Sequence, residues 1–271
     1  MRRFIEPWQA DASRGLRAGE PAAVAAYAEH RRLHTVHPAL LADRVARVHA
    51  NLSADGATIA ITTARVQTAR AVNRAIQFQR RSRHTPGVRL ADGTSAHVGD
   101  QVATRRNSSE RTDRGVAVRN RQVWTVVAVE RNGWLIVDNH DRGRVALPRS
   151  YVAHHVELGW AVTGYGSQGV TTDHAICVVE PGSTRAGVYV GMTRGRHRNI
   201  AIVTDDASLA DPADVLTNLL QRPTRGVTAH ATRTRLHADH AVPLPEPPRP
   251  PEKPWQGRLP PRRRPSIGPR L

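Results

Sequence analysis

The stretch that decides the fold runs from Gly159 to Asp205 and reads GWAVTGYGSQGVTTDHAICVVEPGSTRAGVYVGMTRGRHRNIAIVTD. Two apolar runs within it, AICVVE at 175–180 and NIAIVTD at 199–205, have the length and composition of buried strands. The segment between them predicts a short helix around Val188 to Arg194. Strands that alternate with helices are typical of an α/β domain with a parallel sheet.

The same pattern continues toward the N-terminus. Residues 21–34 are rich in alanine and other good helix formers, so they predict a helix, and residues 40–52 predict a second one. The stretch ATIAITTARVQTARAVNRAIQFQRR begins with a β-branched run at 58–62 and continues with helix-forming residues. It therefore predicts one strand and one helix of the α/β sheet.

Residues 88–152 have a different character, because they are rich in valine and contain several Gly-bearing turns. Within them VWTVVAVERNGWLIVDN predicts two strands that flank an Asn132-Gly133 hairpin turn. This block predicts a small antiparallel β domain, with an SH3-like barrel as the expected form, that interrupts the α/β domain. From about Thr224 onward the chain is dense in proline and arginine, which predicts a disordered basic tail. The tail could attract phosphate, bind a partner as a polyproline ligand, or have no role.

Composition narrows the function classes. The 271-residue chain has 40 basic and 23 acidic side chains, a formal net charge of +17, which suits a polyanionic partner such as nucleic acid. The alternative explanation for the excess of basic residues is a high-GC genome, which encodes arginine wherever a solvated charge is needed. The single cysteine, Cys177, lies in an apolar run and predicts a buried hydrophobe in a cytoplasmic protein. We find no apolar stretch of about 18 residues and no signal peptide, so we expect no membrane.

Two motifs in the 159–205 stretch resemble motifs V and VI of superfamily 1 helicases. The SQG turn at 167–169 is similar to the T-x-H-K-S-Q-G pattern, and YVGMTRGR at 189–196 is similar to Y-V-A-x-T-R-A-R, in the same order. The resemblance implies that Arg194 is an arginine finger, which neutralises charge on the γ-phosphate of ATP. An arginine in a turn after a strand is otherwise an ordinary solvated charge.

The SQG turn implies roles for several further residues. Thr163, Tyr165 and Ser167 would contact DNA. Gln168 and Gly169 would lie at the bound ATP. The chain departs from the family pattern where Tyr165 and Gly166 replace His and Lys and where Thr171 replaces an acidic residue. These departures imply a weaker DNA contact, or one in which Tyr165 stacks on a base.

The likeness extends over most of residues 1–205. The Arg3-Phe4 pair is similar to motif IV of RecD-like helicases, which would make Arg3 a second γ-phosphate ligand. GDQVATRRN and VRNRQVWTVVAV resemble the SH3-like insertion of the second RecA-like lobe. The chain as a whole is most similar to the second lobe in RecD-like and UvrD-like helicases, in particular the helicase part of conjugative relaxases of the MobF or TraA type.

The resemblance implies four segments. Residues 1–86 would form the first part of a RecA-like lobe and 87–152 its SH3-like insertion. Residues 153–223 would complete the lobe with motifs V and VI, and 224–271 would be the tail.

The phosphate-binding half of such an ATPase is missing from this sequence. It needs a Gly-rich loop that ends in Lys-Ser or Lys-Thr, whereas the only lysine here is Lys253, followed by Pro254. We therefore expect ATP and Mg²⁺ only if a partner polypeptide supplies the first lobe with its Walker A and B motifs. The 14 histidines show no paired metal-ligand spacing, so we expect no metal site.

Three hypotheses remain. The chain could be a helicase lobe that supplies Arg194 to a partner lobe and binds single-stranded DNA. It could be a non-catalytic basic DNA-binding module, or a truncated remnant without function. The finger assignment also predicts that Arg194→Ala leaves the fold and the DNA affinity nearly intact.

Overall fold

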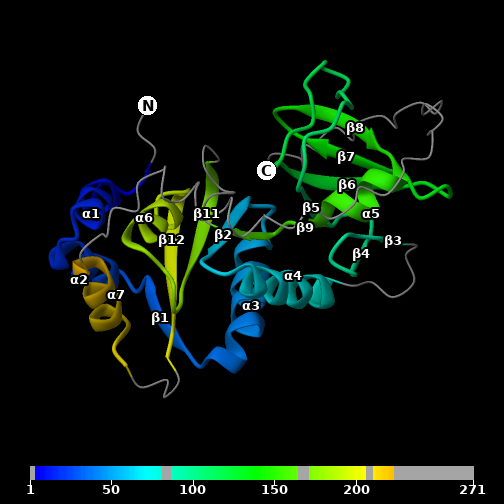
Figure 1. Ribbon diagram of the computed structural model, residues 1–271. Helices are drawn as coiled ribbons and strands as arrows, with labels where there is room; N and C mark the ends of the chain where they lie inside the picture. The colour runs from blue at the N-terminus through cyan, green and yellow to red at the C-terminus, as the bar shows by residue number, and fades with distance from the viewer. Residues whose placement is uncertain (1–3, 81–86, 164–170, 206–209, 223–271) are drawn as a thin grey trace, which may run out of the picture.

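The computed structural model describes residues 4–80, 87–163, 171–205 and 210–222. Its centre is a five-stranded sheet in which every strand runs parallel to its neighbours, in the order β1-β12-β11-β2-β10 (Figure 1). The strands are β1 (Leu33–Val36), β2 (Ile59–Thr63), β10 (Ala161–Thr163), β11 (Thr172–Val179) and β12 (Gly195–Thr204). The predicted α/β class with a parallel sheet is confirmed.

Helices cover both faces of this sheet. One face packs against α3 (Leu41–Ser53) and α4 (Val66–Arg80), and a short 3-10 turn, η1 (Pro38–Leu40), precedes α3. The other face packs against α1 (Pro7–Ala18), α2 (Pro21–Glu29), α6 (Arg185–Gly191) and α7 (Pro212–Gln221).

The central strand β11 shows why its sequence is a continuous apolar run. Side chains alternate across a strand, so neighbouring residues point to opposite faces of the sheet. Ile176 and Val178 belong to the core under α3 and α4, whereas Cys177 and Val179 belong to the core under the other four helices. Both faces are buried, as in other parallel sheets, and no polar face remains.

The second sheet is antiparallel, in the order β8-β7-β6-β5-β9. Its strands are β5 (Gln101–Thr104), β6 (Val123–Val129), β7 (Leu135–Asn139), β8 (Gly143–Leu147) and β9 (Val156–Leu158). A small hairpin of β3 (Val88–Arg89) and β4 (Ser95–Ala96) precedes it, and α5 (Arg149–His155) joins β8 to β9.

The predicted hairpin within this sheet is confirmed. β6 pairs antiparallel with β7, and Gly133 has the positive φ of 84° that the turn requires. The sheet also includes β9, which lies beyond residue 152, the expected end of the β block. The limits of the four expected segments otherwise stay a prediction.

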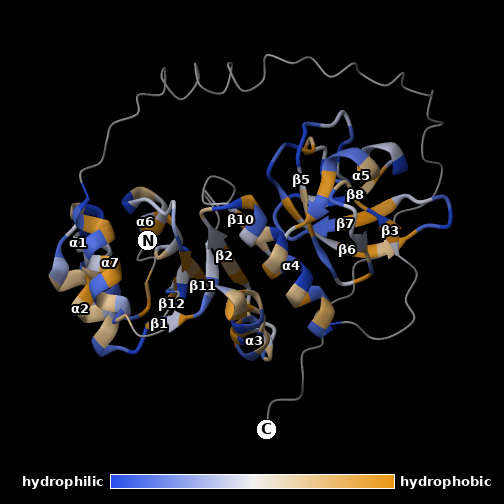
Figure 2. Ribbon diagram, turned by 60° about the horizontal axis from the view of Figure 1, so that its bottom comes forward, coloured by the Kyte–Doolittle hydropathy of each residue, from blue (hydrophilic) through white to orange (hydrophobic). Residues whose placement is uncertain are grey.

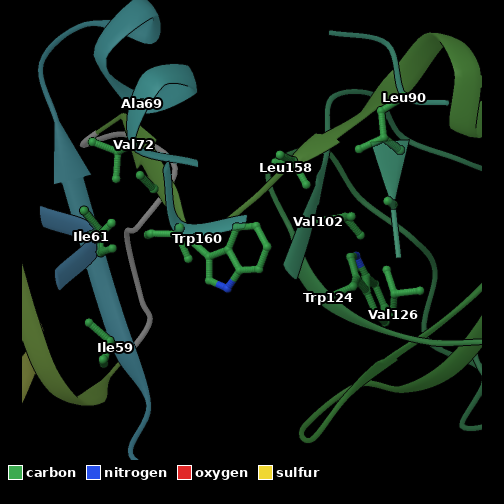
Figure 3. Close-up of a cluster of buried hydrophobic side chains, with 14 of the residues drawn as sticks. Ile59, Ile61, Ala69, Val72, Leu90, Val102, Trp124, Val126, Leu158 and Trp160 are labelled. Atoms are coloured by element: carbon green, nitrogen blue, oxygen red, sulfur yellow. The ribbon is translucent and has the colours of Figure 1, made fainter. Parts of the chain in front are cut away.

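The two sheets meet at a connection of two residues, Gly159 and Trp160. A Cβ atom at Gly159 would lie 2.6 Å from the backbone carbon of Val102 in β5, so only glycine fits there. Trp160 is 4% exposed. Its ring lies between Ile61 of the parallel sheet and residues of the antiparallel sheet (Figure 3). One hydrophobic core therefore runs through both sheets.

Helix α4 fixes the same connection by hydrogen bonds. The Asn73 amide donates to the carbonyl oxygens of Leu158 (2.9 Å) and Ala161 (3.1 Å), and its oxygen accepts from the Ala161 amide (2.7 Å). Figure 2 shows hydrophobic and hydrophilic segments alternating along α4, as expected for a helix that is buried on one side.

Several helices differ from the sequence-based expectations. The helix expected at 21–34 ends at Glu29, because Arg31 adopts a left-handed φ of 55° and Leu33 enters the sheet as part of β1. The helix expected around Val188 to Arg194 begins and ends three residues earlier. The periodicity did not predict α7, although Asp211 caps its first turn by accepting from the Ala213 amide.

No helix in the described ranges combines the length and the apolar character needed to cross a bilayer.

Asn73→Leu tests the joint between the sheets. The substitution leaves two buried carbonyls and one buried amide without partners, so we expect the free energy of unfolding to fall by at least about 3 kcal/mol. Gln79→Leu on the exposed side of the same helix should change it by less than about 0.5 kcal/mol. Urea unfolding followed by circular dichroism measures both, and equal midpoints for the two variants would contradict the account.

His49 makes the fold sensitive to acid. Burial, and to a lesser extent the charge of Arg80, lower the pKa of His49 to about 4 from an ordinary value near 6.5. Only the unfolded chain then binds the proton between these values, so stability is intact above pH 6.5 and is lost as pH falls toward 4, by roughly 3 kcal/mol. His49→Gln should remove that part of the loss in urea titrations at pH 7 and pH 4. An unchanged difference would show that another group is responsible.

Candidate functional site

A pocket lined by hydroxyl groups lies at the carboxyl ends of β2 and β10. Thr163, the last residue of β10, pairs with Thr63, the last residue of β2. The pocket has a volume of about 180 Å³, and the carboxyl edge of a parallel sheet is where α/β proteins commonly bind ligands. Its lining consists of Thr62, Thr63, Ala64, Thr163, Cys177, Val178, Gly182, Ser183, Thr184, Ala186, Gly187, Val188 and Val190.

Some of these hydroxyls already have partners. The Thr63 hydroxyl donates to the Arg65 carbonyl, Ser183 accepts from the Glu180 amide, and Thr184 accepts from the Gly187 amide. Thr163 has no such bond within the described ranges and is half-buried, so its hydroxyl is available to a ligand. The pocket thus joins the predicted DNA-contact residue Thr163 to four hydroxyl-bearing residues that the motif patterns did not identify.

Cys177 does not supply a nucleophile to this pocket. Burial raises the pKa of its thiol to about 12, so the group stays protonated. A Cβ atom on Gly191 of α6 would lie 2.7 Å from its sulfur, which shows how closely the helix covers it. The prediction that Cys177 is a buried, unpaired thiol is confirmed.

The turn that forms one wall of the pocket is held by a buried carboxylate. Glu180, just after β11, accepts from the amides of Ala64 and Arg65 at 3.0 Å each and from the hydroxyl of Thr68. It therefore caps α4, where a negative charge also interacts favourably with the helix dipole. The position of Ala64 in the pocket wall is fixed by this cap.

Arg194 lies at the opposite edge of the sheet. It follows α6 and precedes β12, and its carbonyl accepts from the amide of Thr172, the first residue of β11. The residue is 7% exposed, and its Nε donates to the Val190 carbonyl at 2.8 Å. The side chain is thus buried and bonded rather than solvated. The expectation that Arg194→Ala leaves the fold nearly intact stays a prediction, which the variant itself tests.

Exposed basic residues follow Arg194 at this amino edge. Arg196, His197 and Arg198 are exposed. The His197 ring lies 5.8 Å from that of His174. Burial, followed by the charges of His197 and Arg198, lowers the pKa of His174, so protonation of His174 is disfavoured in this basic cluster.

The N-terminal segment is anchored at the same edge. The backbone amide of Ile5 donates to the Arg196 carbonyl at 3.0 Å, and the side-chain Nε2 of Gln9 donates to the His197 carbonyl at 2.8 Å. Asn199, which is fully buried, donates to the Gln9 side chain and accepts from the Gly195 amide. Neither Gln9 nor Asn199 follows from the helicase motifs, because the bond that joins them links residues 190 positions apart in the sequence.

Several predicted site residues lie outside the described residues: Arg3, Tyr165, Ser167, Gln168 and Gly169. Of the predicted set, Thr163 and Arg194 are described, and they lie at opposite edges of the parallel sheet. The described ranges hold no group of three or more His, Cys, Asp or Glu side chains placed to bind a metal ion.

Comparison with known proteins places the fold. No family model matches the chain. It is similar to uncharacterized proteins from two strains of Mycobacterium tuberculosis, CDC 1551 / Oshkosh and ATCC 25618 / H37Rv. Each is 33% identical over 90 residues, which make up 32% of this chain and 52% of the relative. The match therefore spans about half the length of these curated relatives.

Among solved structures, the chain is similar to a Pif1 helicase from Bacteroides in complex with ADP-AlF3 and single-stranded DNA. The identity is 17% and the TM-score 0.50, over 88% of this chain and 56% of the helicase. A second structure, Bacteroides Pif1 bound to single-stranded DNA, gives 15% identity and a TM-score of 0.50 over 89% and 56%. These likenesses establish a helicase-like α/β fold that corresponds to little more than half of a Pif1 chain.

Arg194→Ala tests the structural role of this arginine. Loss of its hydrogen bond and packing should lower the free energy of unfolding by roughly 1–3 kcal/mol. Arg196→Ala, two residues away and exposed, should lower it by less than about 0.5 kcal/mol. Thermal unfolding followed by circular dichroism compares the two, and a native-like Arg194→Ala variant would show that the side chain is not held as described.

Proposed function

We propose that this chain is the second lobe of an ATP-dependent DNA helicase of superfamily 1, and that it binds single-stranded DNA at the carboxyl edge of its parallel sheet. The observation that carries the proposal is the hydroxyl-lined pocket, which contains Thr163 of the helicase-like motif V. Hydroxyl groups and backbone amides are common partners of DNA phosphates and sugars, and they impose no sequence preference.

Three further observations support it. The formal net charge of +17 favours a polyanion. The helicase-like fold covers nearly the whole chain. The related Bacteroides Pif1 structures were determined with single-stranded DNA, so a protein with this fold binds that ligand.

The nucleotide is proposed to bind at the opposite, amino edge. Arg194 is the proposed arginine finger, with Arg3, Gln168 and Gly169 as further ligands. The basic character of Arg196 and Arg198 fits a phosphate there, but Arg194 would have to leave the Val190 carbonyl to reach it. The sequence contains no Lys-Ser or Lys-Thr loop, so ATP and Mg²⁺ would bind only together with a first lobe that lies outside this sequence.

The finer assignment is to the RecD-like helicases of conjugative relaxases, acting in the cytoplasm without a membrane partner. It is based on the order of YVGMTRGR after the SQG turn and on GDQVATRRN in the β block. A non-catalytic DNA-binding module would share the binding step but would not respond to a first lobe.

Binding and hydrolysis measured together test the proposal. We expect the chain to bind an oligothymidine in fluorescence anisotropy with an affinity that falls steeply with salt, by a slope of about −0.7 per phosphate contact. We expect no ATP hydrolysis above background by the chain alone. ATP turnover by the chain alone would contradict the inference that this sequence lacks the phosphate-binding lobe. Absence of DNA binding at low salt would overturn the proposed function.

Thr163→Val locates the DNA. This nearly isosteric change removes only the hydroxyl, so it should weaken oligothymidine binding by roughly 1–2 kcal/mol, about tenfold, without lowering stability. Thr125→Val is the matched control, because Thr125 is an exposed threonine on β6 of the antiparallel sheet. If the two variants bind alike, the pocket does not hold DNA.

A further inference from the structure

The exposed side of α4 carries an unusual set of side chains. The helix has three arginines and no acidic residue among its 15 residues. Arg70, Arg74 and Phe78 are exposed, and they follow each other at intervals of four residues, which places them on one side of a helix. Four residues rise about 6 Å, so adjacent members of this row are one turn apart. We refer to these three residues as the α4 row.

Phe78 is the feature of the row that the fold does not explain. It is 78% exposed, more than any other large hydrophobic side chain in the described ranges, and the remaining exposed ones are aliphatic. The chain is poor in aromatic residues, at 4%, with phenylalanine only at positions 4 and 78. The buried residues of α4 are Ala69, Val72, Asn73, Ile76 and Gln77, so packing against the core does not involve Phe78.

The two arginines of the row leave positive charge beside Phe78. Arg74 forms no hydrogen bond or ion pair within the described part of the chain. Arg70 donates to Glu157 at 3.1 Å, and Arg105 donates to the other oxygen of the same carboxylate at 3.0 Å. One carboxylate thus serves two guanidinium groups, and the cluster keeps a net positive charge. The Arg70 side chain remains 43% exposed.

The row begins next to the hydroxyl pocket. Ala64, in the pocket wall, lies two residues before the first residue of α4, and Glu180 fixes this turn. Along the helix, Arg70, Arg74 and Phe78 follow this turn in that order.

We infer that the α4 row is a second contact for single-stranded nucleic acid, in which a base stacks on Phe78 while Arg70 and Arg74 bind phosphates. The inference rests on the proposed function and adds a stacking position to it. An aromatic face with adjacent guanidinium groups binds both parts of a nucleotide without sequence preference. A duplex has no free base to stack, so the row selects the single strand.

The test uses the full chain and two ligands: an oligothymidine, and an abasic deoxyribose-phosphate polymer of the same length. Phe78→Ala should weaken binding of the oligothymidine on the order of tenfold. It should leave both the salt slope and the affinity for the abasic polymer unchanged, because Phe78 carries no charge. Phe78→Tyr, which keeps the ring, should bind as the native chain does. Leu40→Ala is the control, because Leu40, the last residue of η1, is another exposed large hydrophobic residue, 55% exposed.

Arg74→Ala gives a complementary readout. It should weaken binding of both polymers and reduce the salt slope by about 0.7, the value for one phosphate contact in a single strand. If native oligothymidine binding is normal and the folded Phe78→Ala variant binds it equally well, the inference is overturned and the proposed function stands. If the native chain binds no single strand, both are overturned.

Discussion

The side-chain amide of Asn73 determines how the parts of this molecule are arranged. It bonds to the backbone at both ends of the short connection, at Leu158 and at Ala161, where the chain passes from the antiparallel to the parallel sheet. Three bonds from one buried side chain leave that connection little freedom to rotate. With Trp160 packed beside it, the antiparallel sheet becomes an extension of the main core rather than a tethered module.

The parallel sheet itself places the hydroxyl and charged groups in fixed positions relative to one another. The parallel sheet has hydroxyls at its carboxyl edge, around Thr63 and Thr163, and arginines at its amino edge, around Arg196 and Arg198. The first set suits the uncharged parts and phosphates of a nucleic acid strand, and the second suits a polyphosphate. According to the proposed function, a lobe with these two edges would bind DNA by itself, whereas nucleotide chemistry would need groups that this sequence does not contain.

The fold was largely predictable because its signals are local. β11 and β12 are apolar runs whose neighbours on both faces are buried, and Asn132-Gly133 is a strong hairpin signal. β1 was missed because Leu33 and Val36 follow an alanine-rich helix, and only the pairing with β12 identifies them as a strand. The site was harder to predict. The hydroxyl-bearing residues of the pocket come together with Thr163 only through the parallel register of the sheet; they are Thr62, Thr63, Ser183 and Thr184. The burial of Arg194 depends on the packing of α6.

Hydrogen–deuterium exchange of the chain with and without a saturating oligothymidine tests whether single-stranded DNA lies on the carboxyl edge of the parallel sheet. With DNA bound there, we expect slower amide exchange at residues 62–65, at 182–187 and in the first turns of α4, with little change at the hairpin of β6 and β7. Protection confined to the antiparallel sheet, with unchanged exchange at the carboxyl edge, would contradict it.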